Sequence, residues 1–199
     1  MTLQDFNDKY WNYYLMLEAK FVNTLSYVSL SQSNFNTYSN EYAHLIQAIG
    51  AELDSFFKEY CGFNPSDYKS ISDYATFILQ NWNDIKSQEV KANQLLLKPF
   101  DNWESARAKQ SLPWWEAFDS IKHSRVANEA KGTLENTINI LAALYIIEMK
   151  WFKEEADKTS QPDIPKVNST LFHLENWNTR YNSTNGLMYT IQNEGLNLK

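Results

Sequence analysis

A short polar stretch holds the residues best suited to chemistry. Residues 119–125 read Asp-Ser-Ile-Lys-His-Ser-Arg. Histidine exchanges protons near neutral pH, so His123 is a candidate general acid or base, and Asp119 is a candidate to orient it. Lys122 and Arg125 are candidates to hold a phosphate group. The structural alternative stays open, in which the two cations are solvated and the histidine is a hydrogen-bonded core residue.

Two adjacent tryptophans, Trp114 and Trp115, precede this stretch, and Pro113 before them suits the first turn of a helix. Successive side chains of a helix point in different directions. We therefore expect one tryptophan to fill the core and the other to cover a groove or to meet a partner chain.

Two glutamates interrupt apolar helix faces. Glu18 lies seven residues after Trp11, and Glu148 lies four residues before Phe152. A buried carboxylate without a partner is costly, so each must be paired, neutral or exposed to a pocket. Either they lie at the rim or bond to a core tyrosine or tryptophan, or they line a polar pocket between the first and last long helices.

Other chemistries have little support. A bundle with two metal ions uses two Glu-x-x-His motifs, whereas this chain has one, Glu41-x-x-His44. The single cysteine, Cys61, excludes an internal disulfide and a cysteine-based zinc cluster. The five glycines are scattered, without a phosphate-binding loop. We therefore predict neither a metal site nor a cofactor.

Charge and hydropathy limit the partners. The net charge of −6 and the pI of about 5.1 argue against broad nucleic-acid binding but permit a local basic patch. The first residues, MTLQDFNDKYW, lack the pattern of a signal peptide, and the apolar run 140–147 is too short to span a bilayer. These features predict a cytoplasmic protein without a membrane segment.

Apolar residues recur at helical spacing over most of the chain. The pattern predicts helices over residues 5–30, 37–61, about 70–82, 113–122 and 124–156. Ser39 and Gly62 suit the two ends of the second helix. If the register of the helix over residues 124–156 is continued back by one residue, His123 lies in line with Leu134 and faces the core or its entrance.

Two segments suggest β-structure. Residues 89–100 favour a short strand that Pro99 limits, and residues 172–174 and 187–191 alternate about Asn185-Gly186, as in a hairpin. The fold class predicted is mainly α, a bundle of four to five helices with a small C-terminal β hairpin. Residues 1–160 form the bundle, and residues 161–199 form a linker and a small β appendage packed on it.

The stretch WWEAFDSIKHSRVANEA, leading into NTINILAALYII, resembles the HEPN superfamily, in particular bacterial members with a W-W-x-x-[YF]-[ND]-x-x-K-H-x-R signature. The resemblance covers most of residues 5–155. It implies a bundle of four or five helices that often dimerises through the face carrying the motif. Many members are metal-independent endoribonucleases of toxin–antitoxin or phage-defence systems, and others are binding or partner modules.

The motif histidine corresponds to His123 and the polar position to Asp119, whereas Phe118 stands where active members carry arginine. The resemblance thus implies a HEPN-like homodimer of bacterial defence or toxin–antitoxin type, a divergent or degenerate endoribonuclease in which Arg125 substitutes for that arginine. The alternative is a non-catalytic module that binds a nucleotide, RNA or a partner protein such as an antitoxin in the same dimer groove. A third hypothesis is a small-ligand site between Glu18 and Glu148.

Overall fold

The computed structural model describes residues 1–159, 165, 167–174, 179–182 and 188–191. Within them the protein is mainly helical, with a small antiparallel sheet, as predicted. The α-helices are α1 (Leu3–Phe6), α2 (Asn12–Thr24), α3 (Asn40–Tyr60), α4 (Ile71–Asn81), α5 (Pro113–His123) and α6 (Leu134–Thr159). A π-helical turn, η1 (Asn7–Trp11), joins α1 to α2, and 3-10 turns occur at η2 (Gln32–Asn34), η3 (Ile85–Ser87), η4 (Ser105–Arg107) and η5 (Val126–Lys131).

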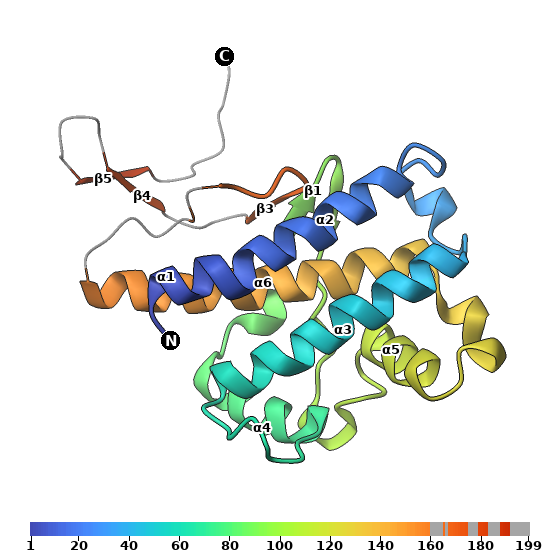
Figure 1. Ribbon diagram of the computed structural model, residues 1–199, viewed down its shortest axis with the longest axis horizontal. Helices are drawn as coiled ribbons and strands as arrows, with labels where there is room; N and C mark the ends of the chain where they lie inside the picture. The colour runs from blue at the N-terminus through green and yellow to red at the C-terminus, as the bar shows by residue number, and fades with distance from the viewer. Residues whose placement is uncertain (160–164, 166, 175–178, 183–187, 192–199) are drawn as a thin grey trace.

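Helix α3 lies at the centre of the bundle and packs against α6, α5 and α2 (Figure 1). Helices α1 and α2 run along α6, and α4 lies beyond the opposite side of α3. Aromatic side chains join these layers: the ring centroids of Phe6 and Trp151 lie 5.1 Å apart, and those of Tyr14 and Tyr145 of α6 lie 5.6 Å apart. Such contacts explain why a chain with 15% aromatic residues builds a large helical core.

The ends of the central helices follow the capping chemistry of the sequence. Ser39 accepts a hydrogen bond from the backbone N–H of Tyr42 at the start of α3. Gly62 follows its end at a φ of +68°, a left-handed conformation that glycine adopts without strain. Ser70 and Asp73 form a capping box at the start of α4. The predicted helices 37–61 and 70–82 are thereby confirmed.

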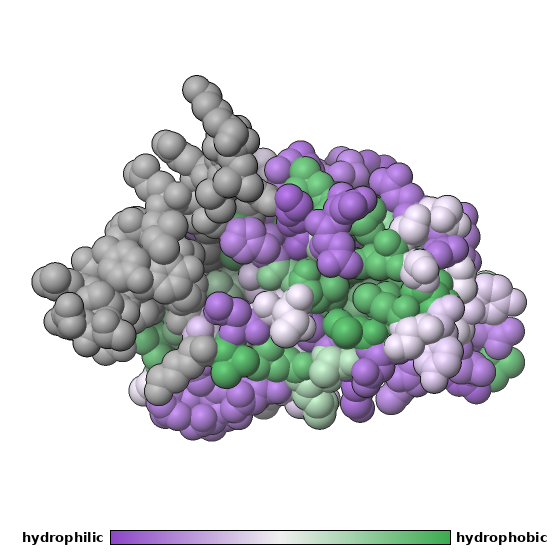
Figure 2. Space-filling view, turned by 90° about the horizontal axis from the view of Figure 1, so that it is seen from above, coloured by the Kyte–Doolittle hydropathy of each residue, from purple (hydrophilic) through white to green (hydrophobic). Residues whose placement is uncertain are grey.

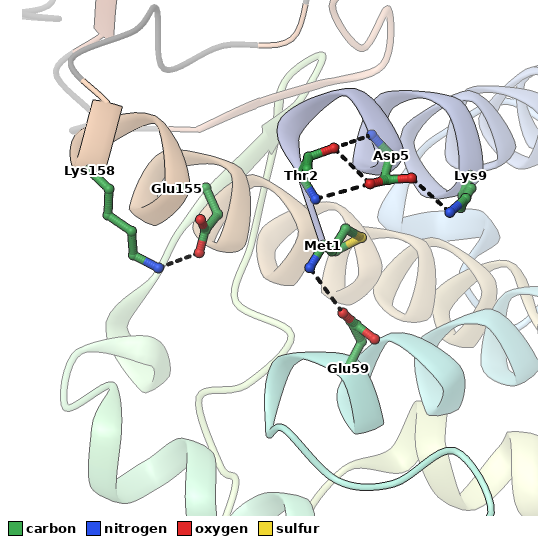
Figure 3. Close-up of polar contacts among 7 residues, drawn as sticks. All are labelled: Met1, Thr2, Asp5, Lys9, Glu59, Glu155 and Lys158. Carbon is green, nitrogen blue, oxygen red and sulfur yellow. Dashed lines mark hydrogen bonds and ion pairs between the residues drawn. The ribbon is translucent and has the colours of Figure 1, made fainter.

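A capping box also starts α1 (Figure 3). The Thr2 hydroxyl accepts a hydrogen bond from the backbone N–H of Asp5, and the Asp5 carboxylate accepts one from the Thr2 N–H. Lys9 pairs with Asp5 at 2.8 Å, and the terminal amine at Met1 lies 3.9 Å from Glu59 of α3. The hydrogen bonds from Lys9 and Thr2 hold the pKa of the Asp5 carboxyl below its usual range.

The prediction of one helix over residues 124–156 was wrong. Helix α5 ends at His123, the 3-10 turn η5 follows, and α6 begins at Leu134. Thr133 caps this second start, because its hydroxyl accepts a hydrogen bond from the Asn136 N–H. The preceding Gly132 packs so closely on α3 that an added Cβ would lie 2.9 Å from the Ala43 backbone nitrogen.

The segment 89–100 forms two strands rather than one. Strands β1 (Val90–Ala92) and β2 (Leu95–Leu97) pair in a hairpin whose turn places Asn93 at a φ of +54°. Strand β3 (Phe172–Leu174) joins the other edge of β1, giving the antiparallel order β2-β1-β3. Val90 is opposite Leu97 on one side and Leu174 on the other, and the Phe172 ring packs on Tyr145 of α6.

Residues 172–174 therefore belong to the sheet of β1 and not to a hairpin of the tail, which corrects the prediction. The tail hairpin consists of β4 (Thr179–Asn182) and β5 (Met188–Ile191), paired antiparallel with Thr179 opposite Ile191. The predicted turn at Asn185-Gly186 lies outside the described residues.

Seen from above, the face that includes α2 carries a patch of hydrophobic residues with polar residues around it (Figure 2). Exposed apolar side chains are common on protein surfaces. Those of this protein include Met16 and Leu96. Among the described helices, none combines the length and the apolar character needed to cross a membrane.

Candidate functional site

The end of α5 exposes its last two residues. Asn128 of η5 closes the helix, because its side-chain amide donates hydrogen bonds to the carbonyl oxygens of Ser120 and Ser124. His123, the last helical residue, has 74% of its side chain exposed, and Lys122 is exposed as well. The prediction placed His123 at the core or at its entrance. The side chain does not enter the core, because the helix ends at this residue instead of continuing past it.

His123 keeps the partner that the sequence suggested. Its Nε2 lies 3.4 Å from Oδ1 of Asp119, one turn earlier on the same helix. The Asp119 side chain is 30% exposed, and its second oxygen pairs with the ammonium group of Lys109. Asp119 is thus fixed from one side by lysine and can orient the imidazole on the other. Because this contact uses Nε2, Nδ1 of His123 is left to exchange a proton with a bound molecule.

These residues line a groove of about 560 Å³. Its walls come from α3, from the loop between α3 and α4, and from α5 with the segment before it. The size falls within the range of ligand pockets. The lining residues are Asp54, Lys58, Pro65, Ser66, Asp67, Tyr68, Lys69, Ser70, Ile71, Lys109, Trp115, Phe118, Asp119, Lys122 and His123.

The groove has a net positive charge on a chain whose net charge is −6, because four lysines in its lining outnumber the three aspartates. Lys58 lies 3.9 Å from Asp54, and Lys109 pairs with Asp119. The ammonium groups of Lys69 and Lys122 instead lie over aromatic rings, 4.4 Å from the centroid of Phe63 and 5.4 Å from that of Phe118. These two cations keep their N–H groups available to an anion.

Arg125 lies apart from this groove. It is exposed, and its guanidinium donates a hydrogen bond of 3.3 Å to the side-chain oxygen of Asn40, at the start of α3. It is not among the residues that line the groove with His123. Within one chain, the structure therefore brings His123, Lys122 and Asp119 together and turns Arg125 toward another helix.

Both tryptophans are buried, and Trp115 also lines the groove, the role that the prediction gave to one of the two. The Trp114 Nε1–H donates a 2.7 Å hydrogen bond to the carbonyl oxygen of Pro99, and its ring meets Phe100 edge-on. Trp115 packs on Phe57 and contributes one wall of the groove, although it is only 6% exposed. At the start of α5, Trp114 thus faces the segment that follows β2, whereas Trp115 faces α3.

Phe118 also serves the core. It is 4% exposed, and its ring lies against Gly50 of α3, where an added Cβ would lie 2.3 Å from a ring carbon. Trp115 meets the same ring edge-on, with centroids 5.3 Å apart. The position at which the resemblance expects arginine is therefore filled by an aromatic ring that packs α5 onto α3.

Glu18 is a structural residue. Tyr14 donates a hydrogen bond to its carboxylate, and the N–H and hydroxyl of Thr170 each donate one of 2.8 Å. The Ser169 hydroxyl donates a further hydrogen bond. The alternative in which Glu18 bonds to a core tyrosine is confirmed, and the partners on the tail tie residues 169–170 to α2.

Glu148 has a different environment, so the two glutamates do not form the shared polar pocket considered from the sequence. It is fully buried in α6, and neither carboxylate oxygen has a hydrogen-bond partner among the described residues. Burial, together with repulsion from Glu52 of α3, raises the pKa of Glu148 well above its usual value. Burial also raises the pKa of Glu52 to about 7.

Replacement of Glu148 by glutamine should stabilise the protein in alkaline solution. The unfolded chain releases this proton near pH 4.5, whereas the folded protein retains it to a higher pH. The contribution of Glu148 to the free energy of unfolding therefore falls as the pH rises above about 4.5. At pH 8 we expect Glu148→Gln to raise the free energy of unfolding by roughly 1–3 kcal/mol, and near pH 4.5 to change it little. Urea unfolding at both pH values measures this.

Glu135 provides the matched control, because it lies in the same helix but is exposed. Glu135→Gln should change the free energy of unfolding by less than about 0.5 kcal/mol at either pH. A gain for Glu148→Gln that is equally large at pH 4.5 and pH 8 would show that the buried charge is not its source.

The remaining titratable candidates show other roles. His44 is exposed and lies 3.8 Å from Glu41 on the same helix. His173 is exposed on β3. Cys61 is buried, and burial raises the pKa of its thiol to about 12, so it is a packing residue. Among the described residues, no three histidine, cysteine or acidic side chains are placed to hold a metal ion.

Most of the residues that line the groove could not be predicted from the sequence. Lys58, Lys69, Lys109 and Tyr68 come from three separate segments, and no spacing in the sequence links them to His123. Charge was no signal either, because Glu59 and Asp67 balance Lys58 and Lys69 within residues 58–69. Comparisons with protein-family models, with curated proteins and with solved structures gave no match for this chain.

Proposed function

We propose that this chain is a HEPN-like protein of bacterial defence or toxin–antitoxin type that binds RNA in the groove beside α5 and cleaves it without a metal ion. The observation that carries the proposal is the His123–Asp119 pair in a groove lined by four lysines. Lysine ammonium groups bind phosphate oxygens, and an oriented imidazole next to them can move a proton.

The proposed reaction is transesterification within one strand. Nδ1 of His123 takes the proton of a ribose 2′-hydroxyl, whose oxygen attacks the adjacent phosphorus. The bond from phosphorus to the 5′-oxygen breaks, and that oxygen takes a proton from solvent, to which the groove is open. The products are a 2′,3′-cyclic phosphate and a 5′-hydroxyl. Lys122 stabilises the negative charge that develops on the phosphate oxygens.

The wild-type protein tests the proposal directly. Labelled RNA incubated with the protein in the presence of EDTA should yield fragments with cyclic phosphate ends. DNA of the same sequence should remain intact, because it lacks the 2′-hydroxyl. If the folded protein, as a monomer or dimer, neither binds nor cleaves RNA at low salt, the proposal is wrong.

Charge reversal in the groove separates binding from chemistry. The double variant Lys69→Glu, Lys122→Glu should weaken RNA binding strongly at low salt, and the dependence of log Kd on log salt should become shallower by roughly one to two units. Both residues are on the surface of the groove, so stability should change little. Fluorescence anisotropy over a range of salt concentrations gives both quantities.

Lys86 and Lys91 offer a matched control, because both are exposed and neither lines the groove. Their double reversal changes the net charge equally and should affect RNA binding much less. Equal weakening by the two double variants would mean that RNA binding depends on overall charge and not on the groove.

A second candidate function is RNA or nucleotide binding without cleavage, as a partner module in the same systems. It is favoured by Phe118, which occupies the arginine position, and by Arg125, which bonds to Asn40. Stable binding of intact RNA by the wild type, with no cleavage, would support this function over the first. The first proposal, RNA cleavage, includes a homodimer in which the second copy adds a cation to the groove. Light scattering, which measures the mass of the protein in solution, tests for the homodimer.

A further inference from the structure

Tyr68 stands out among the lining residues of the groove because it is 96% exposed. Its ring has no ring contact and its hydroxyl no hydrogen bond with any other described residue. An exposed tyrosine of this kind does not contribute to the core. Its flat ring is instead a surface on which another flat group can stack.

The loop that carries Tyr68 is fixed at several points. Phe63 packs against Tyr74 of α4, with ring centroids 6.2 Å apart, and Lys69 covers the Phe63 ring. Within the loop, the Asp67 N–H donates a 3.0 Å hydrogen bond to the carbonyl oxygen of Asn64. Tyr68 is therefore presented by a loop with anchored ends, so that a ligand meets it at low cost in conformational entropy.

We infer that Tyr68 stacks on an unpaired base of the bound strand while Lys69 holds an adjacent phosphate. This inference rests on the proposed RNA-binding function and deepens it. Nucleobases stack on aromatic side chains when their faces are free, whereas in a duplex neighbouring bases cover those faces. Because Tyr68 and His123 line the same groove, the stacked base sets which phosphate lies next to the imidazole.

Two labelled strands test the inference, an oligouridylate of about 12 nucleotides and an abasic strand of the same length. Tyr68→Ala should weaken binding of the oligouridylate roughly 5- to 100-fold, because one stacking contact is lost. It should leave binding of the abasic strand unchanged, because that strand offers phosphates without bases. Tyr68→Phe retains the ring and should bind both strands like the wild type.

Tyr27 is the matched control, since it is 91% exposed but does not line the groove. Tyr27→Ala should bind both strands like the wild type. If Tyr68→Ala binds the oligouridylate normally, or weakens both strands alike, the stacking role is wrong. Loss of binding on charge reversal of Lys69 and Lys122, with normal binding by Tyr68→Ala, would overturn the stacking role alone. If the wild type binds neither strand, both the stacking role of Tyr68 and the proposed function are wrong.

Discussion

His123→Ala should lower the rate of RNA cleavage by roughly 10²- to 10⁴-fold, the usual contribution of a general acid or base. The variant should keep its fold, because 74% of the His123 side chain is exposed. We expect its free energy of unfolding to stay within about 0.5 kcal/mol of the wild type. RNA binding should also persist, since the lysines remain. Cleavage rates at saturating protein measure the loss.

Asp119→Asn provides the companion measurement. The amide can still contact His123 but no longer pairs with it as a carboxylate, so cleavage should slow while RNA binding persists. A purely structural role for His123 predicts another result: a loss of roughly 1–3 kcal/mol in stability on substitution to alanine, with cleavage reduced only in proportion to unfolding.

Phe118→Arg should destabilise the protein rather than activate it. The substitution places the arginine of active HEPN members at its expected position in the motif, but this structure puts the side chain in the core against Gly50. An unpaired guanidinium there loses aromatic packing with Trp115 and buries a charge. We expect the free energy of unfolding to fall by roughly 3–5 kcal/mol.

Calorimetry should show Tm lower by roughly 6–20 °C for this variant. Phe118→Leu should cost less, because an apolar side chain remains over Gly50. Lys122→Arg, one turn later and exposed, controls for the added guanidinium and should leave Tm unchanged. A Phe118→Arg variant that is stable and cleaves RNA faster would contradict this expectation and show that the groove, which Phe118 lines, accommodates the guanidinium.

The helical class and most helix positions could be predicted from the sequence because they depend on local chemistry. Ser39 and Gly62 at the ends of α3, the Ser70–Asp73 capping box and Pro113 in the first turn of α5 act within a few residues. The error came at residues 124–133, where apolar spacing continues. There the caps formed by Asn128 and Thr133 end one helix and start the next.

The end of α5 at His123 determines where the candidate site lies. With a continuous helix His123 would face the core, whereas the end of α5 places it at the rim of a groove. The pairing of His123 with Asp119 was predictable, because residues four apart on a helix are neighbours. The role of Phe118 as a packing residue was not, because it depends on the absence of a side chain at Gly50 of another helix.

The sequence by itself determined the class of fold, the capping of α3 and α4, and the Asp119–His123 pair, since each depends on residues within one or two helical turns. Tertiary structure alone decided which side chains share a space. It brought Lys58, Lys69 and Lys109 beside His123, tied Glu18 to Thr170 across 152 positions, and left Glu148 buried without a hydrogen-bond partner among the described residues. These outcomes follow from how α3, α5 and α6 pack, and contacts between distant segments leave no periodic pattern in the sequence.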